Sequence, residues 1–191
     1  TMAAVAVEAI RALSPVPVLD VIEAGASAAS AQTRSRRVGV IGTLATMDSG
    51  AYEQAIRSRQ PDVTIHSRAC PLFVPLVEEG WLDHPVTRLT AEEYLAPLLA
   101  AGIDTLVLGC THYPLLQPLL QEVAGSPVQL VDSAHTTAQQ ALRLLADRQL
   151  LNPGTSAPIH RYFVTDVPQR FQRVGGRFLD RPLDPLEIVH W

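Results

Sequence analysis

The fold of this chain is decided by one stretch, Ile103–Leu116, which has the sequence IDTLVLGCTHYPLL. Its apolar run Leu106–Leu108 is too continuous for a half-exposed strand and predicts a central parallel strand covered on both faces. A glycine ends the run, and Pro114 stands where the first turn of a helix tolerates proline. Cys110 and His112 are therefore expected at the carboxyl edge of a parallel sheet, where open α/β sheets bind ligands.

Cys110 is a candidate nucleophile or base, because a helix N-terminus lowers the pKa of a nearby thiol. The alternative is an inert cysteine, since free cysteines are often buried. His112, two residues on, favours the reactive role. A Cys-x-His pair can also bind zinc, but the further ligands that a zinc site needs are absent at recognisable spacing. Cys70 has no neighbouring histidine and is predicted to pack in the core.

The composition restricts the class of protein. The chain has 191 residues, enough for one large domain or two small ones, and 47% of them are hydrophobic. Its net charge is −4 and it has no basic stripe, so a nucleic-acid partner is not expected. No apolar run reaches the 18 residues that a membrane span needs.

Two residue counts bear on chemistry and location. All 15 basic residues are arginine, so this chain has no lysine that could hold pyridoxal phosphate as a Schiff base. Its two cysteines are too few for a disulfide scaffold and suggest a reducing, cytoplasmic setting.

Apolar runs and turn signals alternate along the chain. Strands are predicted at residues 16–23, 38–42, 63–70, 106–108, 128–131 and 161–165. Helices are predicted at residues 2–13, 26–31, 49–59, 90–101, from 114, from 133 or 136 to 150, and at 168–179. The segment Thr90–Glu93 has the pattern of a capping box, and the proline-rich tail after residue 179 is expected to be irregular. This alternation predicts an α/β fold with a doubly wound, mostly parallel sheet.

Other polar residues fall at the same sheet edge or near it. Thr43 and Thr46 follow the predicted strand 38–42, although threonines in such places more often form local caps and turns. Glu78 lies in a proline-punctuated segment, 70–80, that could line a cleft; the alternative is a solvated charge.

Several segments resemble glutamate racemases, which are cofactor-independent enzymes of the aspartate/glutamate racemase superfamily. The most specific is Gly109–Pro114, GCTHYP, together with Gly39–Thr46, GVIGTLAT. Weaker matches in the same order are VIEAG at 21–25, SGAY at 49–52, CPLFVPLVE at 70–78, LVDSA at 130–134 and FVTD at 163–166. The resemblance covers essentially the whole chain.

The resemblance implies a role for individual residues. Cys110 would be one of two catalytic thiols, assisted by His112, with Glu78 as a supporting acidic group. Five residues would contact the substrate glutamate: Thr1, Thr43, Thr46, Thr111 and His112. No cofactor and no metal would be needed, and the product D-glutamate would serve peptidoglycan synthesis and so cell wall biogenesis and cell shape. The resemblance also makes a homodimer possible.

The resemblance further implies two similar lobes that face each other across a cleft, with the first lobe incomplete in this chain. Residues 1–19 would be a remnant of the first lobe, residues 20–133 the second lobe, and residues 134–191 a segment that returns to the first. The family's first catalytic cysteine would lie immediately before Thr1. We therefore expect that this chain alone does not racemise glutamate.

Two alternatives remain at this point. One is a racemase of aspartate or another acidic amino acid, which a change of substrate in one assay would separate. The other is a binding lobe without turnover, derived from a cleaved protein, which the intact mass of the natural product would distinguish.

Overall fold

The computed structural model describes residues 2–154 and 156–190, with side chains for residues 6–154 and 156–190. The chain divides into two compact units, residues 1–151 and 152–191. Part of the resemblance, the division into lobes at residues 19 and 133, stays a prediction.

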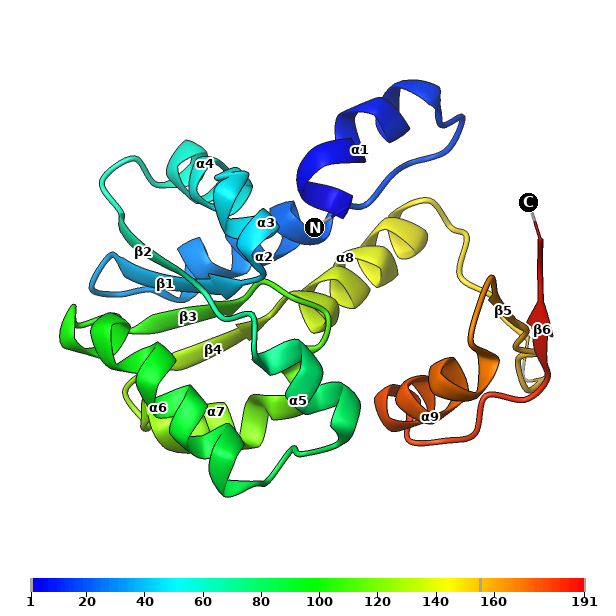
Figure 1. Cartoon of the computed structure of the whole chain (residues 1–191). Coiled ribbons are helices and arrows are strands. Elements are labelled where there is room, and N and C mark those ends of the chain that lie inside the picture. Colours follow the sequence, from blue (N-terminus) through cyan, green and yellow to red (C-terminus); the bar gives the residue numbers. More distant parts are fainter. Residues whose placement is uncertain (1, 155, 191) are drawn as a thin grey trace. The chain divides into compact units, whose positions relative to one another are not determined.

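The first unit is built on a four-stranded parallel sheet with the order β2-β1-β3-β4 (Figure 1). Its strands are β1 (Arg37–Gly42), β2 (Thr64–Ala69), β3 (Thr105–Leu108) and β4 (Gln129–Asp132). Every residue of β3 is buried, and β3 lies between β1 and β4. The prediction of a central parallel strand is confirmed. The strands predicted at residues 38–42, 63–70 and 128–131 are also confirmed, with bounds that agree to within a residue or two.

Helices cover both faces of this sheet. They are α1 (Met2–Leu13), α2 (Val21–Gln32), α3 (Leu44–Asp48), α4 (Ala51–Arg59), α5 (Phe73–Glu79), α6 (Pro85–Ala100), α7 (Gln117–Ala124) and α8 (Ser133–Asp147), with the 3₁₀ helix η1 (Tyr113–Leu116). Helices α5, α6 and α7 lie on one face, while α2, packed between α4 and α8, lies on the other (Figure 1). The predicted doubly wound α/β fold is confirmed for this unit.

The strands supply side chains alternately to the two cores, because successive strand residues point to opposite faces. Ile41, Leu106 and Leu108 join the core beneath α5, α6 and α7. Val40 and Val107 join the core beneath α2 and α4. The continuous apolar run in β3 is therefore explained by two cores that share one strand.

The order of the strands creates a crevice at the carboxyl ends of β1 and β3. From β1 the chain crosses to β2 on one side, and from β3 it crosses to β4 on the other. Ligands of open α/β sheets bind where the strand order reverses in this way. Gly42 and Gly109 end the two strands at this point.

The predicted strand at 16–23 is wrong. The structure instead begins helix α2 at Val21, and the Asp20 carboxylate caps it by accepting a hydrogen bond from the Ile22 backbone N–H at 3.0 Å. The apolar content of this segment favours a strand. The buried Asp20 at the N-cap position starts a helix there instead.

Two other helix starts differ from the prediction. Helix α6 begins at Pro85 and is capped by His84, so Thr90 lies within it and donates to the Val86 carbonyl at 2.7 Å. The Thr90–Glu93 capping box is thus wrong, because proline at the first helical position had already started the helix. Helix α4 begins at Ala51 rather than at residue 49, after Gly50 in the left-handed conformation.

The second unit, residues 152–191, contains helix α9 (Pro168–Leu179) and the parallel strands β5 (Tyr162–Val164) and β6 (Leu186–Ile188). The predicted helix and the predicted strand at 161–165 are confirmed. The tail is not irregular, because β6 pairs with β5 there. The register pairs Tyr162 with Leu186, and pairing between residues so far apart in the chain depends on the tertiary fold and leaves little local signal.

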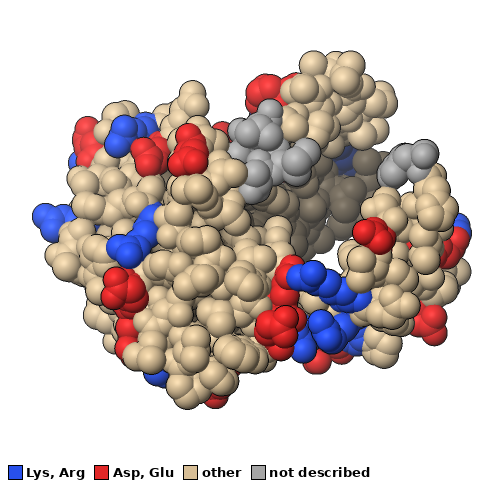
Figure 2. Space-filling view, in the orientation of Figure 1, with Lys and Arg blue, Asp and Glu red and all other residues tan. Residues whose placement is uncertain are grey.

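Arginine and acidic side chains are interspersed on the face of the first unit seen in Figure 2. Such mixing is typical of solvated surface charge. Across the described residues, no helix combines the length and apolar character that crossing a membrane requires.

Candidate active site

A cavity of about 300 Å³ opens at the carboxyl ends of β1 and β3. Its lining comes from five parts of the first unit: Val21 and Ile22; Thr43, Thr46 and Tyr52; Val74; Gly109–His112 with Pro114; and Ser133 with Ala134. Four segments that are distant in sequence therefore meet the Cys110 segment here. Of the residues predicted for the site, Thr43, Thr46, Cys110, Thr111 and His112 all line this cavity.

Cys110, His112 and Glu78 form a chain of contacts at its edge. The Cys110 Sγ lies 4.0 Å from His112 Nδ1, and His112 Nε2 lies 3.5 Å from Glu78 Oε1. The Thr111 hydroxyl is 3.4 Å from the same Nδ1. Glu78 is thus brought to the site through His112 although it does not line the cavity, while its neighbour Glu79 is exposed.

The thiol of Cys110 differs from expectation in its ionisation. Burial raises the pKa of Cys110, and backbone N–H groups of His112 and Tyr113 only partly offset this effect. The helix that follows is a single 3₁₀ turn, Tyr113–Leu116, and the α-helix α7 begins only at Gln117. The prediction of a lowered thiol pKa is therefore wrong, because desolvation outweighs the few N–H groups that face the sulfur.

Two threonine hydroxyls face each other after β1. The Thr43 and Thr46 hydroxyl oxygens are 2.9 Å apart, and the Thr43 hydroxyl also accepts from the Thr46 backbone N–H at 3.4 Å. Thr43 is thereby the N-cap of α3, which agrees with the expectation that threonines in such places form local caps, and it also lines the cavity. The structural and the functional interpretations of these threonines are compatible.

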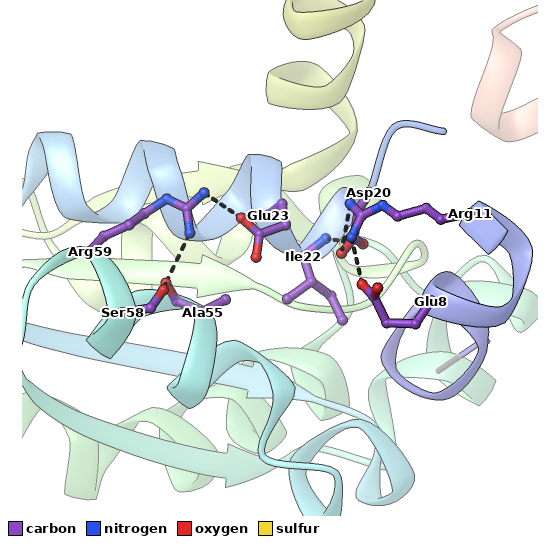
Figure 3. A network of polar contacts seen from close by, with 8 residues as sticks. All are labelled: Glu8, Arg11, Asp20, Ile22, Glu23, Ala55, Ser58 and Arg59. Atoms are coloured by element: carbon purple, nitrogen blue, oxygen red, sulfur yellow. Dashed lines mark hydrogen bonds and ion pairs between the residues drawn. The ribbon is translucent and has the colours of Figure 1, made fainter. Parts of the chain in front are cut away.

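The wall formed by Val21 and Ile22 is fixed by a network of polar contacts (Figure 3). Asp20 caps α2 and lies 4.0 Å from Arg11 of α1, which also pairs with Glu8. In the first turn of α2 itself, Glu23 pairs with Arg59 of α4. The N-terminus of α2 is held on both sides, which keeps its first residues at the cavity.

Sequence reasoning gave no role to two polar residues of the cavity, Tyr52 and Ser133. Tyr52 is 3% exposed, and burial raises its pKa to about 12. The resemblance included both only as members of matched segments, Tyr52 in SGAY and Ser133 in LVDSA. Ser133 is the first residue of α8, whose N-cap is Asp132, and the Asp132 carboxylate accepts from the Ala134 backbone N–H at 2.8 Å.

Two further residues were considered in the sequence, Thr1 and Cys70. Thr1 is outside the described residues. Cys70 is fully buried, packs in the core beneath α5, α6 and α7, and does not line the cavity. Its predicted core role is confirmed. Within the described part of the chain, no three His, Cys, Asp or Glu side chains gather closely enough to hold a metal ion.

Known proteins are similar to this chain in sequence and in fold. A family model for Asp/Glu/hydantoin racemases matches residues 1–141. A glutamate racemase of Syntrophus aciditrophicus is 60% identical over 99% of this chain and 70% of its own length. One from Neisseria meningitidis is 54% identical over 77% of this chain, which spans about half, 54%, of that relative.

Solved structures agree with these matches. A glutamate racemase isoform from Bacillus anthracis superposes with a TM-score of 0.91 at 34% identity, over 98% of this chain and 70% of that one. One from Francisella tularensis, solved in complex with D-glutamate, gives 0.89 at 36% identity, over 99% and 70%. With the family model matching residues 1–141 and the fold shared over nearly its whole length, this chain belongs to the Asp/Glu/hydantoin racemase family.

Proposed function

We propose that the protein interconverts L- and D-glutamate without a cofactor, with Cys110 as the acid or base on one face of the α-carbon. The observation that carries the proposal is the placement of Cys110 beside His112 in the cavity at the sheet edge. The 60% identity to a glutamate racemase supports glutamate as the substrate.

Inverting an α-carbon requires one group that removes its proton and another that returns a proton on the opposite face. Burial keeps Cys110 largely protonated, so it is ready to donate. To act as the base it must first lose its proton, and the nearest ring nitrogen is that of His112. Glu78 Oε1 lies 3.5 Å from the other ring nitrogen, Nε2, and is placed to hold the orientation of the ring. These roles match those that the resemblance implied.

The hydroxyls of Thr43, Thr46 and Thr111 are proposed to bind the substrate's carboxylate and amine. Thr43 caps α3 directly after β1, Thr46 lies in α3, and Thr111 follows β3, so these hydroxyls line the cavity from two different segments. Hydrogen bonds from fixed hydroxyls orient the α-carbon toward the thiol and cost little reorganisation during reaction.

Cys70 is not proposed as the opposing acid. It is fully buried, its Sγ faces the Arg68 carbonyl at 3.7 Å, and burial raises its pKa to about 12. Cys110 is the one thiol that lines the cavity among the described residues. We therefore propose that the second acid is not among the described residues. It would come from a lobe that faces the one described here, equivalent to the part of the relatives that this chain does not match.

The cellular role is proposed from the reaction. D-glutamate would be supplied to peptidoglycan synthesis in the cytoplasm, and so to cell wall biogenesis and cell shape. We also propose a homodimer, which the resemblance makes possible and which light scattering tests.

Deuterium wash-in at the α-carbon tests the proposal. L- and D-glutamate are incubated separately in heavy water and followed by proton NMR, with aspartate as the control substrate. We call a protein that contains this chain together with the proposed second acid the racemising form. This form should exchange and invert both enantiomers of glutamate. Cys110→Ala should abolish inversion, and Cys70→Ala should preserve it. Inversion by Cys110→Ala would refute the role of Cys110. Inversion by the 191-residue chain alone would refute the external second acid.

A further inference from the structure

Tyr52 has no part in the mechanism proposed above, although it is a buried residue of the cavity. It lies in the first turn of α4 and packs in the core that α2 shares with β1 and β3. A buried tyrosine usually finds a partner for its hydroxyl, and its ring contributes a large packed surface. Both ends of this side chain are placed by specific neighbours.

The ring occupies a slot between two glycines. A Cβ atom at Gly25, in α2, would lie 3.1 Å from Tyr52 Cε1. A Cβ atom at Gly109, directly after β3, would lie 3.0 Å from Tyr52 Cε2 and 2.8 Å from the Ile41 carbonyl oxygen. The two edges of the ring thus rest against backbone that has no side chain. One of these two glycines, Gly109, is the residue immediately before Cys110.

The hydroxyl is placed through Ser133. The Tyr52 hydroxyl hydrogen-bonds with the Ser133 side chain, and the Ser133 hydroxyl donates to the Leu108 carbonyl at 3.2 Å. Leu108 is the last residue of β3. The ring and the hydroxyl therefore reach the end of the same strand from two directions.

We propose that Tyr52 is a positioning residue for Cys110, whose ring, seated between Gly25 and Gly109, fixes the strand end from which the thiol enters the cavity. The ring carries this role, and the hydroxyl adds an anchor on α8. The proposal rests on the proposed function only for its use in catalysis, because the placement of the thiol can be measured without turnover.

Among the described residues, His112, Tyr113 and Tyr52 are the titratable groups that act on Cys110. His112 lies 4.0 Å from the sulfur, and Tyr113 and Tyr52 interact with it electrostatically. Burial is the main reason that the pKa of Cys110 is raised. Removing the ring should admit water behind the thiol, so the pKa of Cys110 should fall toward its ordinary value.

The test is the alkylation of Cys110 by iodoacetamide between pH 6 and 10, in the 191-residue chain with Cys70→Ala as background. Tyr52→Leu should lower the pH midpoint by at least about 0.5, which is about threefold more thiolate below the midpoint. Tyr52→Phe keeps the ring and should leave the midpoint unchanged. Ile56→Ala, a buried substitution in the same helix outside the cavity, is the matched control for lost stability.

Three outcomes would overturn the proposal. One is a midpoint in Tyr52→Leu equal to that of Ile56→Ala, which would make Tyr52 a core residue only. Another is an equal shift in Tyr52→Phe and Tyr52→Leu, which would assign the effect to the hydroxyl. If circular dichroism shows that Tyr52→Leu does not fold, Gly25→Ala decides, because its new Cβ would press on the ring. An unchanged midpoint in Gly25→Ala would then refute the proposal. Racemisation enters none of these measurements, so their failure is separate from failure of the proposed function.

Discussion

His112 and Glu78 are joined across 3.5 Å, from Nε2 to Oε1, with about a quarter of each side chain exposed. The histidine follows β3 and the glutamate belongs to α5, so the contact links the sheet edge to the helix that covers it. The other ring nitrogen of His112 is the one that faces Cys110. An acidic side chain in this position fixes the direction in which a histidine ring presents its second nitrogen.

Removing the Glu78 carboxylate should slow racemisation while substrate binding is largely kept. In the racemising form, we expect His112→Gln to lower kcat by about a hundredfold, the lower end of the range for general acid–base groups. Glu78→Gln should lower kcat by less, about tenfold, because Glu78 acts through His112. Initial rates from both enantiomers measure this. Glu79→Gln, an exposed neighbour on the same helix, is the control and should be unaffected. A change confined to KM would contradict an orienting role.

The Thr43 hydroxyl should serve both α3 and the cavity. Thr43→Val removes the N-cap acceptor and should cost about 1 kcal/mol of unfolding free energy, together with a raised KM. Thr43→Ser keeps the oxygen and should restore both properties. Denaturant unfolding and steady-state kinetics measure the two effects. Loss of stability without any change in KM would leave Thr43 as a cap only.

The two cysteines should react differently in the folded chain. Cys110 lines the cavity and should be alkylated at a rate that rises with pH beyond the range of an ordinary thiol, because burial raises its pKa. Cys70 is fully buried and should react only on unfolding. Mass spectrometry of peptides after timed alkylation separates the two sites. Equal rates in the native chain would contradict the described burial.

Asp104 should make stability depend on acid pH. Burial opposes its ionisation, but hydrogen bonds from Thr33, Ser35 and Arg34 outweigh burial and hold the pKa of Asp104 well below its usual value. Because the pKa of Asp104 is lower in the folded state, its ionised carboxylate stabilises the protein at pH values above the unfolded-state pKa of aspartate, which is near 4. That stability is lost as the pH falls below it.

The corresponding variant is Asp104→Ala, which should lose about 1–3 kcal/mol at pH 7 and show a flatter stability profile between pH 4 and 2. Asp62→Ala removes an exposed pair with Arg36 and should cost less than about 1 kcal/mol. Thermal unfolding across this pH range measures both. An unchanged profile in Asp104→Ala would show that its hydrogen bonds do not contribute.

The central strand, the helix bounds 168–179 and the cluster of Cys110, His112 and two threonines followed from local sequence alone. These features could be predicted because buried parallel strands need continuous apolar runs. Parallel strands also bring their carboxyl ends to one edge. The helix starts at Val21 and Pro85 were missed because a capping aspartate or histidine is recognisable only once its backbone partner is known.

The tertiary structure alone decided the pKa of Cys110 and the place of Tyr52. A short motif shows the N–H groups that favour a thiolate, but burial comes from residues far along the chain, and here burial is the larger effect. The slot for Tyr52 joins Gly25, Gly109 and Ser133, which no local pattern connects. The sequence by itself therefore determined which side chains reach the sheet edge, whereas packing across the core decided how they are held and how they ionise.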